Sequence, residues 1–146
     1  GVSVYLLDEE ASDPQAAALA LRESAADARG GGAPLDRDVA EALAAMVSRE
    51  VRASAKRLGG ALVAEFAERV PVLEGRPLRA AGFRVLKGPD LPSALIELGF
   101  LSNAEDRARL VDPAWRARAV AAVVAALEDW AAAEPPRRGA VRAEGD

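Results

Sequence analysis

The chain has 146 residues, 51% of them hydrophobic, and a formal net charge of −4. This length and apolar content suffice for one domain with a hydrophobic core, and the mild negative charge argues against nucleic-acid binding, which requires a clustered basic surface. Cysteine and histidine are both absent, which excludes disulfides and thiolate metal sites and removes the commonest general base and the commonest zinc ligand. No apolar stretch is long enough to cross a bilayer, so we expect no membrane span.

The first predicted elements are a strand and a helix. The run VSVYLL, from residue 2, combines β-branched, aromatic and aliphatic residues, which predicts an interior strand covered on both faces. Ser12 and Asp13 offer side-chain oxygens for a helix N-cap, and Pro14 suits the first helical turn. A helix is therefore expected to run from Pro14 to the glycines at 30–32, which end it.

A second, longer helix is predicted after Pro34, with one buried stripe. Its charged residues fall mostly on the other faces, where we expect them to be solvated. Gly59 and Gly60 mark either a bend or a close contact in this helix. The stripe recurs at four-residue spacing and comprises Val39, Leu43, Val47, Val51, Leu58, Leu62, Phe66 and Val70.

The next segment is predicted to contain a loop and two short extended runs. Residues 71–81 are interpreted as a loop because prolines and a glycine interrupt them. Extended runs are expected at 83–86 and 93–98, since each proline of the intervening GPDLP lacks an amide donor and disfavours helix in the preceding residue.

Two helices are predicted to complete the ordered part of the chain. Ser102 and Glu105 fit a capping box for the helix NAEDRARLV, and Asp112 with Pro113 begins the last helix. The tryptophans of the last helix are expected in the core rather than on a ligand-binding surface. Its predicted buried stripe comprises Trp115, Ala119, Val123, Leu127 and Trp130.

The alternation of strands and helices favours an α/β layered fold with a largely parallel sheet. In such sheets reactive groups gather beyond the carboxyl ends of the strands. Glu97 is expected at such an end, and Gly99 lets the chain turn away, so that the carboxylate is directed into a cleft. From the residues alone, however, a surface or ion-paired glutamate is the commoner role at this kind of position.

The segment GFRVLKGPDLPSALIELGFLSNAEDRARLVDPAWR resembles the carboxyl-terminal part of the zinc-dependent N-acetylmuramoyl-L-alanine amidases. GVSVYLLDEEAS is similar to the strand that follows the second zinc histidine of that family, so the resemblance covers residues 1–133 as part of one catalytic domain. It implies a zinc exopeptidase-like fold. It also implies peptidoglycan as substrate and hydrolysis of the amide bond between N-acetylmuramic acid and the L-alanine of the stem peptide.

By this resemblance Glu97 is the catalytic glutamate, a general base for zinc-activated water. The zinc ligands of the family are two histidines and a glutamate in segments upstream of the motifs found here, so we expect no metal ligand in this chain. The chain is accordingly expected to be an amino-terminally truncated domain that neither binds zinc nor hydrolyses peptidoglycan alone. The alternative is a noncatalytic envelope binding or regulatory module that retains the amidase fold.

The resemblance also implies regulation and a location. Residues 12–44 correspond to an insertion whose helix can occlude the zinc site in cell-division amidases, and LRESAAD makes Glu23 the candidate inhibitory acid. An envelope activator protein acting on this insertion is the implied partner. A periplasmic or cell-envelope location follows from the family, since GVSVYLLDEE shows no signal peptide. Residues 134–146 are expected to form a disordered tail.

Overall fold

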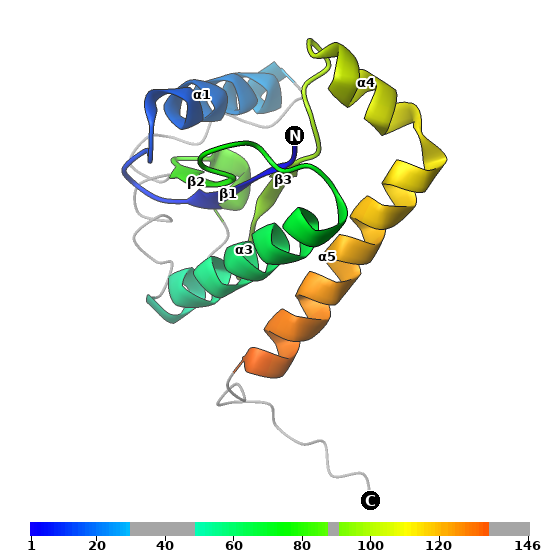
Figure 1. Cartoon of the computed structure of the whole chain (residues 1–146). Helices are drawn as coiled ribbons and strands as arrows, with labels where there is room; N and C mark the ends of the chain where they lie inside the picture. Colours follow the sequence, from blue (N-terminus) through cyan, green and yellow to red (C-terminus); the bar gives the residue numbers. More distant parts are fainter. Residues whose placement is uncertain (30–48, 88–90, 135–146) are drawn as a thin grey trace, which may run out of the picture.

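The computed structural model describes residues 1–29, 49–87 and 91–134, which form a layered α/β structure (Figure 1). Helix α1 covers one face of a small sheet, and helices α3 and α5 cover the other. The elements, in chain order, are β1 (Ser3–Leu7), α1 (Pro14–Arg29), α3 (Arg49–Arg69), β2 (Leu78–Ala81), the 3₁₀ helix η1 (Arg84–Leu86), β3 (Leu95–Glu97), α4 (Ala104–Val111) and α5 (Pro113–Ala133).

The sheet has the strand order β2-β1-β3 and is mixed. Strand β1 pairs in parallel with β2, with Val4 opposite Leu78, and antiparallel with β3, with Ser3 opposite Glu97. The prediction of a largely parallel sheet is therefore wrong for β3. A parallel connection normally includes a crossover helix, and the described part of the link from β2 to β3 holds only the short turn η1.

Strand β1 is the central strand, as its composition predicts, and its alternating side chains divide the core into two parts. Val2 and Val4 point toward α3 and α5, where they pack with Leu62 and Phe66. Tyr5 points to the opposite face and packs in a second cluster with α1 and η1, whose other buried members are Ala16, Ala20, Ala81, Phe83 and Leu86. Both faces of β1 are thus covered.

The predicted helical stripes are confirmed in α3 and only in part in α5. Leu58, Leu62, Phe66 and Val70 are all buried, as expected, whereas positions 39–47 of the same predicted stripe lie outside the described residues. In α5 the prediction is wrong for Leu127, which is 44% exposed. The buried positions of α5 after Trp115 and Ala119 are Ala122 and Ala126, so the buried face advances by three residues and then by four, as a helix of 3.6 residues per turn allows, whereas the predicted stripe kept a step of four up to Leu127.

Two short segments differ from their predicted conformation. Residues 78–81, predicted as part of a loop, form strand β2 because they pair with β1. Residues 83–86, predicted as extended, instead contain the 3₁₀ helix η1. The run at 93–98 does contain a strand, β3.

Side-chain caps fix the starts of three helices. Asp13 accepts a hydrogen bond from Ala16 N at 2.9 Å, and Asp112 accepts one from Ala114 N at 2.9 Å, as predicted for α1 and α5. For α4 the N-cap is Asn103 rather than Ser102, because the Asn103 side chain accepts hydrogen bonds from Glu105 N and Asp106 N. Within the described ranges no helix has the length and hydrophobicity needed to cross a membrane.

Candidate active site at the end of strand β3

Glu97 is the last residue of β3 and lies beside the first residue of β1. Because β3 runs antiparallel to β1, the carboxyl end of β3 meets the amino end of β1. Glu97 was expected beside the carboxyl ends of parallel strands, and this is wrong, because it lies beside the amino end of β1. Glu97 is nevertheless the last residue of its own strand. Its side chain is half-buried, so it is shielded from water without being sealed from it.

Two hydroxyl groups of β1 contact one oxygen of this carboxylate. Tyr5 Oη donates a hydrogen bond to Glu97 Oε2 at 3.1 Å, and Ser3 Oγ lies 3.3 Å from the same oxygen. Ser3 Oγ is also 3.3 Å from Tyr5 Oη, so the three groups form a closed polar triangle. Ser3 and Tyr5 share a face of β1 because they are two residues apart, and Glu97 joins that face from the neighbouring strand.

The environment of Tyr5 keeps its hydroxyl protonated. Burial raises the pKa of Tyr5 most strongly, and the charge of Glu97 and its hydrogen bond raise it further. The hydrogen bond from Ser3 and the positive charge of Arg79 lower this pKa, but they do not outweigh the other effects. Tyr5 therefore stays a hydrogen-bond donor to the carboxylate at neutral pH.

The turn after Glu97 is anchored by Asp106, which is 3% exposed. Asp106 accepts hydrogen bonds from Phe100 N at 3.0 Å and from the amino group of Gly1 at 3.0 Å. Glycine at position 99 leaves room for Asp106, since a Cβ atom there would lie 3.0 Å from Asp106 Cβ and would push it aside. The structure thus supports the predicted role of Gly99, and the turn fixes where β3 and its carboxylate end.

The residues present do not fit a zinc centre by themselves. Among the residues that the structure describes, no three histidine, cysteine, aspartate or glutamate side chains are grouped to hold a metal ion. The neighbours of Glu97 Oε2 are hydroxyls, and a tetrahedral zinc site needs imidazole, thiolate or carboxylate ligands. Any zinc bound near Glu97 would need ligands from outside this set.

Glu23, the predicted inhibitory acid, lies exposed on α1. Helix α1 covers the face of the sheet that carries Tyr5, and its second half extends toward the side where β1 begins (Figure 1). The helix is therefore on the correct face for a role near Glu97. The inhibitory role itself stays a prediction, and most of the remaining insertion, residues 30–44, lies outside the described residues.

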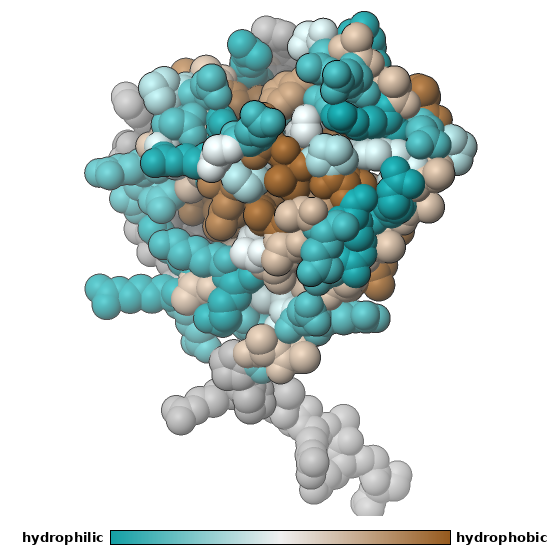
Figure 2. All heavy atoms as spheres, viewed as in Figure 1, coloured by the Kyte–Doolittle hydropathy of each residue, from teal (hydrophilic) through white to brown (hydrophobic). Residues whose placement is uncertain are grey.

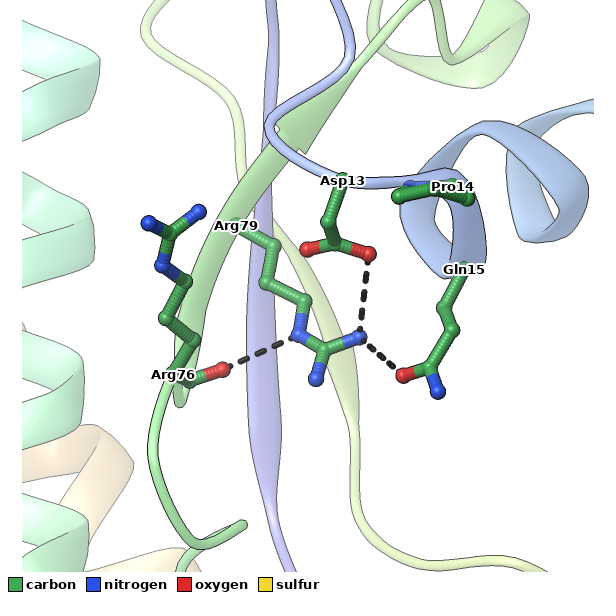
Figure 3. Close-up of a pocket in the computed structure, with 5 residues that line it drawn as sticks. All are labelled: Asp13, Pro14, Gln15, Arg76 and Arg79. Carbon is green, nitrogen blue, oxygen red and sulfur yellow. Dashed lines mark hydrogen bonds and ion pairs between the residues drawn. The ribbon is translucent and has the colours of Figure 1, made fainter.

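A separate cleft of about 440 Å³ lies at the start of α1. Figure 3 shows the Arg79 guanidinium at its wall, between Asp13 and Gln15. Arg79 donates hydrogen bonds to Gln15 Oε1 at 3.0 Å and to the carbonyl of Arg76 at 3.0 Å, and it pairs with Asp13 at 3.4 Å. Because Arg79 is already engaged and no residue of the Glu97 triangle lines this cleft, we do not assign the chemistry to it.

The fold and the site together define an α/β protein with a half-buried candidate acid–base carboxylate at a strand end. Its residues 1–129 match the model of the N-acetylmuramoyl-L-alanine amidase family, and the chain belongs to that family. It is also similar to the N-acetylmuramoyl-L-alanine amidase AmiC of Escherichia coli O6:H1 (strain CFT073), with 38% identity over 61 residues. That alignment covers 40% of this chain and 15% of the relative, so the chain spans only a small part of that protein.

Sequence reasoning identified Glu97 but missed Ser3 and Tyr5. A signal was present, because two residues with hydroxyl groups alternate in a strand that is otherwise aliphatic. A buried hydroxyl needs a hydrogen-bond partner, so a serine and a tyrosine on one face of an interior strand indicate a third polar group opposite them. The antiparallel register that supplies Glu97 as this group could not be seen in the sequence.

Proposed function

We propose that this chain supplies the proton-transferring carboxylate of a peptidoglycan amidase that cleaves the bond between N-acetylmuramic acid and L-alanine. The observation that supports the proposal is the position of Glu97. This chain belongs to the amidase family, and its Glu97 is half-buried at a strand end, with hydrogen bonds from the neutral hydroxyls of Ser3 and Tyr5.

Hydrolysis of an amide needs one group that can both accept and return a proton. As the water oxygen attacks the carbonyl carbon, Glu97 takes a proton from the water. The carbon–nitrogen bond then breaks, and Glu97 gives the proton to the departing nitrogen, which becomes the free amino group of L-alanine. General acid–base catalysis of this kind contributes about 10²- to 10⁴-fold to a rate.

The carboxylate alone does not complete the site. The family is generally zinc-dependent, and the described residues do not form a zinc centre. The proposal therefore includes metal ligands from sequence outside this chain, and the isolated chain is expected to be inactive. An envelope location, an activator protein and the inhibitory role of Glu23 belong to the same proposal and rest on the family alone.

Replacing Glu97 by glutamine in the zinc-loaded product of the complete gene tests this proposal. The rate at which free stem peptides are released from purified peptidoglycan should fall by about 10²- to 10⁴-fold, because glutamine cannot accept the water proton. Mass spectrometry of the products identifies the bond that is cut. Glu105→Gln is the matched control, because Glu105 is exposed on α4 and pairs with Arg109 in the same helix.

Two outcomes would contradict the proposal. A Glu97→Gln protein with the wild-type rate would remove Glu97 as the base. A zinc-loaded wild-type protein that binds peptidoglycan without releasing any peptide would instead favour the noncatalytic binding module.

A further inference from the structure

We propose that Ser3 and Tyr5 are positioning residues that hold Glu97 by Oε2 and so present Oε1 as its proton-accepting oxygen. This inference rests on the proposed function of Glu97 as general base, and it adds two residues to which that function assigns no role. Among the described residues, the hydrogen-bonding contacts of the carboxylate fall on Oε2, at 3.1 Å from Tyr5 and 3.3 Å from Ser3. A carboxylate held at one oxygen cannot rotate freely about its last bond.

The two hydroxyls are rigid because their own residues are packed. Ser3 is 0% exposed and Tyr5 is 2% exposed. The Tyr5 ring meets the Phe83 ring edge-on, with 5.2 Å between centroids, and it packs in the same cluster as Ala16 and Ala20 of α1. The position of the Tyr5 hydroxyl is therefore set by the core and not by Glu97, as a positioning role requires.

The triangle has three oxygen–oxygen pairs within hydrogen-bond distance but only two hydroxyl protons to share among them. Tyr5 and Ser3 each supply one of these protons. With Tyr5 donating to Glu97, the Ser3 proton can go either to Tyr5 Oη or to Glu97 Oε2. In both arrangements Oε2 remains an acceptor for at least one hydroxyl, so the same oxygen is always the one engaged.

Within the described ranges, two charged side chains act on Tyr5. Glu97 comes from β3 and Arg79 from β2, and both act on Tyr5 through their charges. The residues of α1 in the cluster around Tyr5 are uncharged, namely Ala16, Ala20 and the partly buried Leu19, and the ring of Phe83 precedes η1. A change in the titration of Tyr5 can therefore be traced to a small set of neighbours.

Tyr5 is the only tyrosine in the sequence, so the 146-residue chain has a built-in spectroscopic probe. Its ionisation is followed by the near-ultraviolet absorbance of tyrosinate during an alkaline titration, with circular dichroism reporting that the fold persists. Glu97→Gln should lower the titration midpoint, since the charge of Glu97 and its hydrogen bond both raise the pKa of Tyr5. Ser3→Ala should raise it, because the Ser3 hydrogen bond lowers that pKa.

A matched control separates the triangle from a general effect of losing a buried hydroxyl. Ser54 is also buried, and its hydroxyl accepts a hydrogen bond from Trp130 Nε1 in the other core. Ser54→Ala should leave the midpoint unchanged, and Tyr5→Phe should abolish the titration. If the protein unfolds at alkaline pH before Tyr5 ionises, the ring resonances of the one ¹³C-labelled tyrosine are measured at neutral pH instead of the midpoint. These resonances should shift in Glu97→Gln and Ser3→Ala but not in Ser54→Ala. Unmoved signals in the two triangle variants would overturn the inference.

Activity then distinguishes this inference from the function on which it rests. In the zinc-loaded product of the complete gene, Tyr5→Phe should lower kcat by about 10- to 100-fold, as removing an orienting partner typically does, with little change in KM. If Glu97→Gln is inactive while Tyr5→Phe and Ser3→Ala keep the wild-type kcat, the positioning role fails and the proposed function stands. If Glu97→Gln is fully active, the proposed function fails whatever the spectra show.

Discussion

Two acidic residues close to the start of β1 are held in opposite ways. Glu97 is held at one oxygen by neutral hydroxyls. Asp106 is engaged at both oxygens: Oδ1 contacts the amino group of Gly1 at 3.0 Å and Arg109 at 3.2 Å, and Oδ2 accepts from Phe100 N at 3.0 Å. Asp106 therefore has a structural role, whereas Oε1 of Glu97 is left for the proton transfer that we propose.

Asp106 should make the free energy of unfolding depend on pH in the acidic range. In the isolated 146-residue chain, whose terminal amino group is on Gly1, burial raises the pKa of Asp106, but the hydrogen bonds from Phe100 and Gly1 and the positive charge of that amino group outweigh burial and hold the pKa below the usual value of an aspartate. A group whose pKa is lowered by folding stabilises the fold above its unfolded pKa, about 3.9, and that contribution is lost as the pH falls through the folded pKa.

In the isolated 146-residue chain, Asp106→Asn should consequently reduce the free energy of unfolding by about 1–3 kcal/mol at neutral pH, because an amide cannot replace a carboxylate among these donors. The gap between wild type and variant should narrow below about pH 4, where the wild-type carboxyl also loses its charge. Urea unfolding at a series of pH values measures both effects. Asp129→Asn, an exposed substitution on α5, is the control, and a gap independent of pH would contradict the assignment.

At the scale of elements, two adjacent glycines of α3 have opposite surroundings. A Cβ at Gly59 would lie 2.9 Å from Leu78 Cδ1 and 3.1 Å from Leu6 Cδ2, since α3 approaches the sheet closely there. A Cβ at Gly60 would meet no atom within 4 Å. The sequence left open a bend or a close helix contact for this pair, and the structure instead shows a close approach to the sheet at Gly59.

Alanine at these two positions should change stability in different directions. Gly60→Ala should stabilise the chain by up to about 1 kcal/mol, since alanine is the better helix former. Gly59→Ala gains the same propensity but must displace core leucines, and overpacking costs about 1–3 kcal/mol, so it should be the less stable variant. Thermal or urea unfolding of both proteins gives the comparison; equal stabilisation would show that the helix does not sit as close to the sheet as described.

Local pattern predicted those elements whose conformation is set by their own residues. The Asp13 and Asp112 caps and the apolar strand β1 are of this kind. Strand β2 is not: its sequence LRAA has little strand propensity, and it is extended because it pairs with β1. Residues 84–86 differ in the other direction. Their valine and leucine favour a strand, but the chain forms the turn η1, in which Leu86 N donates a hydrogen bond to Phe83 O.

The candidate site was predictable in part for the same reason. Glu97 lies in the motif ALIELGFLSN, and Gly99 indicates a turn after it, so both residues could be chosen as candidates from the sequence. The contacts of Glu97 with Ser3 and Tyr5 span more than 90 residues and depend on β3 running antiparallel to β1. Strand direction is a property of the whole sheet, and no local pattern encodes it.

At the scale of the molecule, the described part of the chain leaves apolar surface uncovered. Figure 2 shows hydrophobic side chains at the centre of one face, framed by hydrophilic residues. On α5, Val120, Val124 and Leu127 are 62%, 48% and 44% exposed and follow one another along one side of the helix. In the three-stranded sheet, β2 and β3 are both edge strands. These surfaces and the 15% coverage of the AmiC relative agree with a proposal in which further sequence completes the site.

The last prediction concerns zinc and uses the whole 146-residue chain. With neither histidine nor cysteine, only carboxylates could bind the ion, and in the described regions no three of them are grouped. We therefore expect the purified chain, after dialysis, to contain much less than one equivalent of zinc by elemental analysis, and calorimetric titration to show no tight site. Glu97→Gln should give the same result, because one carboxylate without further ligands adds little affinity. One tightly held zinc per chain that is lost in Glu97→Gln would make Glu97 a metal ligand, and the base in amide hydrolysis would then have to be another residue.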